Sequence, residues 1–395
     1  MRNSAWGCWG IVGGLLIATA GLAAGPSAAK ISFKKTQIDA KFRSEGVAVA
    51  DFNGDGKPDI AVGSVYYAGP DWKMHPILAE PKSFPPEQYS DVFACFACDV
   101  NRDGRVDLVT IDIPGLQTWW SENPGPAGGP WKRHLAVKVT SNENPIWADV
   151  FGDGRKMLVC GYSPEANNPD SPLRHMVFAY PGKDPNEPWT LQRFSNNASP
   201  GSARFYHGLG VGDINADGLN DVVCYEGWWE QPKDKSQKEW AFHRASLGEH
   251  SAQMLVYDFN GDGRADVLST SAHRYGIWCH EQTADGWKTH LIDKSVSQTH
   301  AVVLADINGD GLMDFVTGKR FWAHTRGDPG IDEPAMLLWF ELSRKDGRPV
   351  WTKHPIDDNS GVGLQFEVLD VNGDGLLDIV TSNKKGVYYF QQVRE

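Results

Sequence analysis

One nine-residue pattern, Asp-x-Asn-x-Asp-Gly-x-x-Asp, occurs six times in the chain and is dense in oxygen ligands. Side-chain oxygens stand at positions 1, 3, 5 and 9, and a main-chain carbonyl is available at position 7. The glycine at position 6 permits the tight turn that folds these oxygens around one hard cation. Carboxylates packed this closely repel one another unless a cation lies between them. The pattern therefore predicts Ca²⁺ sites, about six in all.

The predicted calcium ligands are the four side chains of each copy: Asp51, Asn53, Asp55, Asp59, Asp99, Asn101, Asp103, Asp107, Asp213, Asn215, Asp217, Asp221, Asp258, Asn260, Asp262, Asp266, Asp306, Asn308, Asp310, Asp314, Asp370, Asn372, Asp374 and Asp378. An EF-hand is excluded because position 12 of the first copy is Val62 rather than Glu, and because β-type runs flank the pattern. A further, damaged copy begins at Asp149 and has Phe151 at position 3 and Met157 at position 9. We expect that copy to bind no ion.

Histidines and a glutamate recur at fixed distances before these loops. Glu143, His207 and His300 stand six residues before the first Asp of their copies, and His250 stands eight residues before. The innermost strand of each unit alternates its faces, so both sets can converge on the mouth of a central channel. Such a set suits zinc or another transition ion. The alternative is a solvated rim, or polar strand ends that satisfy neighbouring backbone groups.

An insertion at residues 318–334 is expected to lie over the same mouth. Its charged and histidine side chains are Lys319, Arg320, His324, Asp328 and Glu333. A loop of this composition could clamp an anionic or polyhydroxylated ligand. The alternative is an ordinary charged surface loop.

The elements that position these residues repeat together with the loops. The first aspartates of successive copies, the damaged one included, are 45 to 64 residues apart. Each copy follows a short apolar run and precedes a β-rich run, an aromatic strand and a strand led by Trp. Four short strands per unit at this period are typical of propeller blades. The histidines that recur on the Trp-led strands are expected to pack within the repeat: His134, His243, His290 and His354.

The two ends of the sequence complement each other. The last unit stops after its aromatic strand, at Tyr388–Phe390, and has no Trp-led strand. Residues 33–38, FKKTQI, are similar to that missing strand. A ring closed in this way leaves no exposed sheet edge. We therefore predict an all-β fold, a single seven-bladed β-propeller over residues 30–395 whose N-terminal strand completes the last blade.

Residues 1–29 have the features of a secretory signal peptide. Arg2 is the only charge before Lys30, and Ile11–Ala24 is an apolar stretch rich in small residues. The alternative is a membrane anchor, but this stretch is short and glycine-rich, and no other run of about 18 apolar residues occurs. We expect a secreted, periplasmic or cell-envelope protein that has no transmembrane segment once the signal is removed.

Charge and cysteine content narrow the classes of function. The net charge is −12 and no basic cluster occurs, which argues against nucleic-acid binding. After signal removal five cysteines remain, and an odd number cannot all pair internally. The pairing stays open, although most of the five fit a role as small buried hydrophobes.

The repeated loops, with their flanking strands, resemble the FG-GAP/VCBS repeat family. The resemblance covers residues 30–395 and rests on the segments DFNGDGKPD, DVNRDGRVD, DINADGLND, DFNGDGRAD, DINGDGLMD and DVNGDGLLD. It implies a β-propeller with calcium loops between the first and second strands of each blade. The calcium ions are then expected to stabilise the fold rather than to act in a reaction.

A second resemblance concerns three strand-to-loop segments and one insertion. HGLGVGDINADG, GEHSAQMLVYDFNGDG and THAVVLADINGDG, with GKRFWAH, are similar to the propeller domain of aldos-2-ulose dehydratases. That resemblance implies a zinc ion that coordinates a keto-sugar for dehydration. Carried over to this chain, the metal ligands are His207, His250 and His300, with Glu143 as a fourth. His273 and Lys319 are the candidate acid or base, and the cupin domains of the fungal enzyme have no counterpart here.

Two functions of different classes follow from these patterns. The first is an exported, calcium-stabilised carbohydrate lyase or dehydratase that acts on a keto-sugar at the channel mouth through a histidine-bound metal. The alternative is a non-catalytic propeller that binds a glycan or a protein on the same face. In either case we expect a carbohydrate or a small sugar derivative as the natural ligand, and only the first needs a transition metal.

Overall fold

The computed structural model describes residues 30–165, 167–235, 237–324 and 327–395. The predicted signal peptide, residues 1–29, lies outside this part of the chain. Within the described residues the regular elements are β-strands and a 3₁₀ turn at Gly125–Ala127, and no α-helix occurs. No helix in these ranges is long and apolar enough to cross a membrane. The all-β prediction is confirmed.

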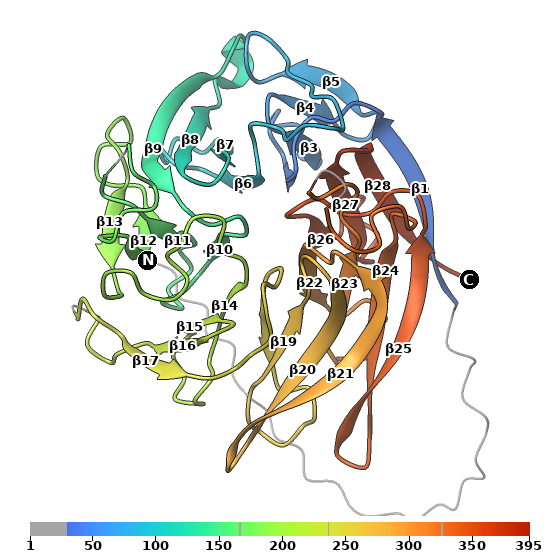
Figure 1. The fold of residues 1–395 in the computed structure, drawn as a ribbon. Coiled ribbons are helices and arrows are strands. Elements are labelled where there is room, and N and C mark those ends of the chain that lie inside the picture. Colours follow the sequence, from blue (N-terminus) through green and yellow to red (C-terminus); the bar gives the residue numbers. More distant parts are fainter. Residues whose placement is uncertain (1–29, 166, 236, 325–326) are drawn as a thin grey trace, which may run out of the picture.

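The strands are arranged as radial sheets around a common axis (Figure 1). The strands nearest the axis are β2 (Ala48–Ala50), β6 (Ala94–Cys98), β10 (Ile146–Ala148), β14 (Leu209–Gly212), β18 (Leu255–Tyr257), β22 (Ala301–Ala305) and β26 (Glu367–Leu369). The second strands are β3 (Asp59–Val62), β7 (Asp107–Ile111), β11 (Met157–Tyr162), β15 (Asp221–Cys224), β19 (Asp266–Thr270), β23 (Asp314–Gly318) and β27 (Asp378–Asn383).

The outer halves of the sheets contain the longer strands. The third strands are β4 (Val65–Ala68), β8 (Leu116–Glu122), β12 (His175–Tyr180), β16 (Gly227–Glu230), β20 (Tyr275–Thr283), β24 (Leu337–Lys345) and β28 (Gly386–Arg394). The outermost strands are β5 (Lys73–Pro76), β9 (Lys132–Thr140), β13 (Thr190–Arg193), β17 (Ala241–Arg244), β21 (Gly286–Ser297), β25 (Arg348–Asp357) and β1 (Ile31–Asp39).

Every pairing among these strands is antiparallel. In the described residues they form five sheets of four strands and one sheet of eight. The larger sheet consists of two four-stranded units, β6–β9 and β10–β13, which are joined where Tyr162 pairs with Thr140. Each unit except the last, whose outermost strand is β1, runs outward in chain order, which is the up-and-down arrangement of a propeller blade.

The N-terminal strand closes the ring. β1 pairs with β28 from Ile31 opposite Arg394 to Asp39 opposite Val387. The main chains of Lys30 and Glu395 extend this pairing, with N···O distances of 2.9 and 3.0 Å. The last sheet therefore has the order β1-β28-β27-β26, and the predicted completion of the last unit by the N-terminal strand is confirmed.

The core lies between neighbouring sheets because the second strands are buried along their whole length. The recurrent outer-strand histidines belong to this packing. His134 stacks on Trp120, His243 on Trp228 and His354 on Trp339, with ring centroids 4.2–4.3 Å apart. In each case the histidine Nε2 also contacts a glutamate on the same pair of strands. The predicted packing role is confirmed for these three histidines, while His290 repeats only the contact with a glutamate, Glu281.

The cysteines of the described residues are free thiols. They are Cys95, Cys98, Cys160, Cys224 and Cys279. Burial raises the pKa of the Cys95 thiol to about 12 and that of Cys98 to about 11. Thiols held in this state are poor nucleophiles and poor metal ligands, so the Cys95-x-x-Cys98 pair acts as part of the core.

Candidate metal centre at the channel mouth

The six intact Asp-rich loops join the first and second strands of their units. In the first loop, between β2 and β3, Asp51 accepts main-chain N–H bonds from Gly54 and Gly56 at 2.7 and 2.8 Å. The buried Asp59 accepts main-chain N–H bonds from Phe52 and Gly69. The loops at Asp258, Asp306 and Asp370 repeat the contacts of Asp51.

The donors in these loops fit a hard cation. Each loop offers carboxylate and amide oxygens, the ligand class that Ca²⁺ prefers. Burial, and to a lesser extent the charge of neighbouring loop aspartates, raises the pKa of Asp107 and of Asp314 to about 7. A bound divalent cation would offset that accumulation of negative charge. The calcium assignment itself stays a prediction.

The damaged loop is built differently. Phe151, at position 3, packs edge-on against Phe178 and Trp240, with ring centroids 5.4 and 6.3 Å away. Met157, at position 9, is buried at the start of β11. An aromatic ring and a thioether thus stand where the other loops carry oxygen ligands, which supports the expectation of an ion-free loop.

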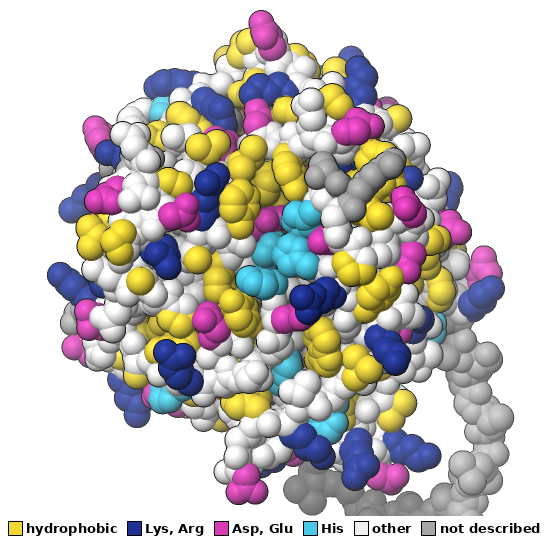
Figure 2. Space-filling model, viewed as in Figure 1, with side chains coloured by type: hydrophobic (Ala, Val, Ile, Leu, Met, Phe, Trp, Pro, Cys, Tyr) yellow, Lys and Arg dark blue, Asp and Glu magenta, His cyan; other side chains and the backbone are white. Residues whose placement is uncertain are grey.

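Histidines gather at the opposite end of the channel, at the centre of the face shown in Figure 2. They come from five connections between strands: His207, His250, His273, His300 and His324. Ring centroids are 4.5 Å apart for His273 and His324, 4.8 Å for His207 and His273, and 5.5 Å for His207 and His300. The convergence predicted for His207, His250 and His300 is therefore observed, and two further histidines join it.

A local backbone feature aims four of these histidines at the axis. Two residues before each of them stands a residue with positive φ: Phe205 (56°), Gly248 (103°), Gln298 (54°) and Trp322 (51°). A positive φ is unusual for residues other than glycine, and for a bulky side chain it stores strain that the surrounding structure must hold. Three strained non-glycine turns at one mouth are typical of a functional site.

His300 is the most telling member of the cluster. Its Nδ1 lies 3.2 Å from the carbonyl oxygen of Gln298, so Nδ1 carries the proton and Nε2 keeps its lone pair. The residue is fully buried, and its Nε2 has no hydrogen-bond partner. Burial and then the charge of Arg320 hold the pKa of His300 well below its usual value. A neutral imidazole with an unused inward lone pair is the state in which histidine binds a metal.

His300 belongs to two groups of ligand atoms. One atom each from His273, His300 and His324 lie within 4.8 Å of one another, and the same is true of Glu143, His207 and His300. Because only one nitrogen of His300 is unused, His300 could serve as a ligand in only one of these groups at a time, or for one ion placed between them. The set contains imidazole nitrogens and a carboxylate, which suits zinc or a similar transition ion.

His207 and Glu143 face each other in the second group. Asn144 donates its amide N–H bonds to the carbonyls of His300 and Leu364, so its oxygen accepts the Nδ1 proton of His207 at 2.9 Å. The other nitrogen, His207 Nε2, lies 3.2 Å from Glu143 Oε2. Two lone pairs at that distance require a proton or a metal ion between them.

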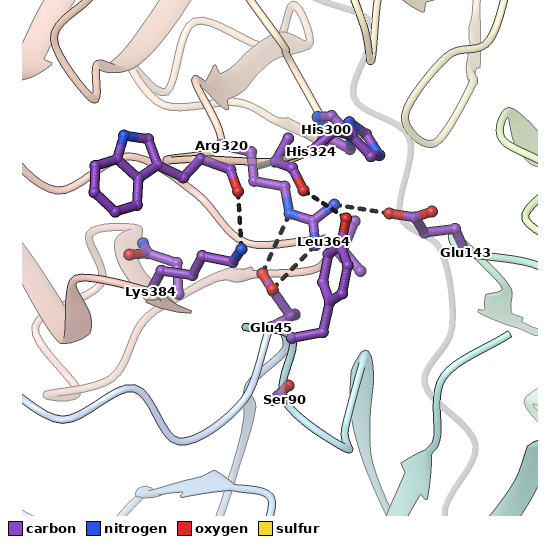
Figure 3. Close-up of polar contacts among 12 residues, drawn as sticks. Glu45, Ser90, Glu143, His300, Arg320, His324, Leu364 and Lys384 are labelled. Carbon is purple, nitrogen blue, oxygen red and sulfur yellow. Dashed lines mark hydrogen bonds and ion pairs between the residues drawn. The ribbon is translucent and has the colours of Figure 1, made fainter. Parts of the chain in front are cut away.

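Arg320 closes the floor of the site (Figure 3). Its guanidinium is fully buried and donates to both oxygens of Glu45, at 3.0 and 3.3 Å, and to Glu143 Oε1 at 2.7 Å. Burial alone would raise the pKa of Glu143, but His207 and Arg320 hold it well below its usual value. Glu143 therefore stays ionised, with one oxygen fixed by Arg320 and the other turned towards His207.

Side-chain amides fill the channel behind this layer. Gln253 donates to the carbonyl of Leu364 and accepts from the Val302 N–H, and Gln365 accepts from the Val47 N–H. These bonds tie innermost strands of different units to one another. The histidine site is therefore entered from the mouth rather than through the channel.

A cavity of about 340 Å³ lies in front of the histidines. Its lining residues are Tyr89, Phe93, Glu143, Phe205, His207, His250, His273 and His324. Phe205 is 41 % exposed and its ring lies under the guanidinium of Arg204 at 4.7 Å. The volume is at the small end of the range for small-molecule sites, and the wall combines aromatic rings with a few polar groups.

The structure agrees with the predicted positions of some site residues, agrees in part for others, and differs for one. Glu143, His207 and His300 lie together as expected for the metal set. His250 lines the cavity but belongs to neither ligand group, and His273, predicted as an acid or base, belongs to one. Lys319 does not face the histidines, because its ammonium donates to the carbonyls of Gly330, Ile331 and Glu333. Its proposed role in proton transfer is therefore not retained.

The role of the insertion is also corrected in part. It lies over the mouth as predicted, but Arg320 is consumed by buried ion pairs and cannot clamp a ligand. His324 and Asp328, which were predicted only as possible ligand clamps, instead provide a candidate metal-ligand nitrogen and the carboxylate behind it. The sequence signal for His324 was its place on the charged insertion, whereas the positive φ of Trp322 two residues earlier is visible only in the structure.

Comparison with known protein families finds repeat models that match two stretches of this chain. An FG-GAP-like repeat model matches residues 258–317, and an FG-GAP repeat model matches residues 45–70. The first stretch contains two intact Asp-rich loops, at Asp258 and Asp306, and the second contains one, at Asp51. This chain carries FG-GAP repeats. The resemblance to the propeller domain of aldos-2-ulose dehydratases stays a prediction.

Two curated relatives match most of this FG-GAP chain. Cartilage acidic protein 1 of Mus musculus is 22 % identical over 396 residues, which cover 86 % of this chain and 57 % of the mouse protein. The Homo sapiens protein of the same name is 21 % identical, with 86 % of this chain and 56 % of its own length covered. The chain thus spans little more than half the length of these relatives.

Two similar solved structures both have TM-scores below 0.5. A lectin of Agrocybe aegerita that recognises non-reducing terminal N-acetylglucosamine has a TM-score of 0.47 and 14 % identity, with 94 % of this chain and 87 % of the lectin covered. The exotype rhamnogalacturonan lyase YesX has a TM-score of 0.45 and 10 % identity, with 94 % and 74 % covered.

Proposed function

We propose that this FG-GAP propeller binds a transition-metal ion at its channel mouth and uses it to act on a small sugar derivative. The observation that carries the proposal is the His300 imidazole, whose buried Nε2 has no hydrogen-bond partner and points to neighbouring ligand atoms. An orphaned buried nitrogen costs free energy unless something binds it. A metal ion bound to this nitrogen would remove that cost, and the nearby imidazoles would complete the coordination of the ion.

Some residues of the channel mouth would bind the metal ion, and others would transfer protons. His273, His300 and His324 would hold the ion, since each presents a nitrogen within ligand distance of the others. When bound, such an ion supplies Lewis-acid polarisation of a sugar oxygen. His207, fixed at Nδ1 by Asn144, can hold or release a proton at Nε2, where Glu143 stabilises the charged form. This arrangement supports a lyase or dehydratase reaction on a keto-sugar.

The aromatic wall supports a carbohydrate as the ligand. Phe205 presents an exposed ring at the rim, held in a strained conformation and backed by Arg204. Aromatic faces of this kind stack on the apolar faces of sugar rings. The same feature favours the alternative function, in which the propeller binds a glycan without transforming it. In that alternative the ligand on this face could also be a protein.

We also propose that the six intact loops hold structural Ca²⁺ and that the protein is exported. Oxygen-only donor sets and the chain's net charge of −12 support the calcium assignment. The signal-like residues 1–29 support export. Sequencing the N-terminus of protein purified from the cell envelope and from the culture medium tests the second part.

Metal analysis tests the central proposal. Protein purified without chelators should contain one equivalent of zinc or another transition ion beside its calcium, and His300→Gln should lose the transition ion alone. His290→Gln, on an outer strand beside Glu281, is the matched control and should keep both metals. Wild-type protein that takes up no transition ion, or H300Q that binds it normally, would contradict the metal site. Incubation with keto-sugars, followed by NMR for loss of water, separates catalysis from binding.

A further inference from the structure

The segment between β23 and β24 carries His324, and its described residues, 319–324 and 327–336, form what we name the strap. Its first part is held by two side chains of other units: Lys384 donates to the Trp322 carbonyl and the Tyr89 hydroxyl donates to the Ala323 carbonyl, both at 2.8 Å. Figure 3 shows both contacts beside Arg320. The strap residue next to the ligand His324 is thus fixed from below.

The far part of the strap is fixed as well. The buried ammonium of Lys319 donates to the carbonyls of Ile331 and Glu333, at 3.2 and 2.7 Å. Gln298 donates to the Pro329 carbonyl at 3.1 Å, and the Tyr275 hydroxyl donates to the Glu333 carboxylate at 2.5 Å. A buried lysine whose ammonium donates its hydrogen bonds to main-chain carbonyl oxygens holds that main chain in one position.

Between these two anchored parts lies Asp328. Its Oδ2 accepts from His324 Nδ1 at 2.6 Å and lies 3.5 Å from His273 Nδ1. His273 belongs to the β19–β20 connection, so one carboxylate joins the strap to the neighbouring unit. A proton on each Nδ1 leaves the Nε2 lone pair of both rings free for the site.

We propose that Asp328 is the positioning residue of the metal centre, since it orients two of its three histidine ligands at once. This inference rests on the proposed metal site. A carboxylate behind a metal-bound histidine fixes the ring and its tautomer and makes the nitrogen a better ligand. Most such carboxylates serve one histidine, whereas Asp328 serves His273 and His324 together. Transition-metal affinity would therefore depend on the docked strap, although Asp328 belongs to neither group of ligand atoms.

Metal titration of Asp328 variants tests this role in calcium-saturated protein. Zn²⁺ competition against a chromophoric chelator should give about 10- to 100-fold weaker binding for Asp328→Ala, and Asp328→Glu should recover part of the loss. At saturating Co²⁺, the visible absorption bands of D328A should shift, because two ligands change orientation. Asp332→Ala is the matched control: it lies on the same strap, is exposed, and forms no ion pair with the described histidines.

The outcomes separate this inference from the proposed function. If His300→Gln binds zinc like the wild type, the metal site itself is wrong. If H300Q loses zinc while D328A matches D332A in affinity and Co²⁺ spectrum, only the role of Asp328 is overturned. Should D328A not fold, Asp328→Asn keeps the size of the side chain, and affinity equal to that of Asp332→Asn overturns the role in the same way.

Discussion

At the residue scale, Arg320 is the side chain whose loss we expect to cost most. It is fully buried and balances two buried carboxylates, Glu45 and Glu143. Arg320→Met would leave both without their cation, and breaking a buried pair in this way costs about 3–5 kcal/mol. Urea unfolding in calcium should show this loss. Arg155→Met, which removes an exposed pair with Asp153, is the control and should change little; equal effects of the two variants would contradict the assignment.

A second residue-scale prediction concerns His280, which is buried away from the metal centre between Ser269 and Thr289. Burial and then His290 lower its pKa to about 4, below the ordinary value of 6.5. The unfolded chain therefore takes up a proton first as the pH falls, and stability is lost below about pH 6.5. His280→Gln should remove on the order of 2 kcal/mol from the stability difference between pH 7 and pH 5. Denaturant titrations at both pH values measure it, and parallel curves for the two proteins would refute it.

The grouping of site residues into one metal set could be predicted from the sequence only where the residues follow the repeat. Glu143, His207 and His300 share one offset from the Asp-rich loops, so the phase of the repeat places them on one face. His273 and His324 have no such offset, because they stand on connections that differ in length between units. Lys319 looked reactive in the sequence, yet its partners are main-chain carbonyls that side-chain spacing cannot reveal.

At the element scale, the damaged loop offers a gain-of-function test. Phe151 and Met157 replace two oxygen ligands, while Asp149 still accepts a main-chain N–H bond from Gly154, as the first Asp of intact loops does. Phe151→Asn with Met157→Asp restores the pattern and should raise the calcium content by one equivalent over the wild type. Phe151→Asn alone lacks the position 9 carboxylate and should not. An unchanged calcium content in the double variant would show that more than the ligands was lost.

At the scale of the whole molecule, the architecture could be predicted from the sequence because the same pattern recurs from unit to unit. A period of 45–64 residues, a Gly-turn loop and a Trp-led strand together specify four antiparallel strands, and the sheets have that composition. The pairing of β1 with β28 was predictable since residues 33–38 match the strand that the last unit lacks. The joining of two units through Tyr162 and Thr140 was not, because it is a single pairing at the ends of β11 and β9 that no repeated pattern in the sequence marks.

The charge of the whole chain leads to the last prediction. Three aspartates in each of six intact loops account for the acidic surplus behind the net charge of −12, and six Ca²⁺ ions would neutralise it. Without the ions these closely spaced carboxylates repel one another, so EGTA should lower the melting temperature markedly, and added calcium should restore it. His300→Gln should show the same drop, because its site lies at the other end of the channel. A melting temperature indifferent to EGTA would mean that main-chain N–H bonds, such as those to Asp51, suffice to hold the loops.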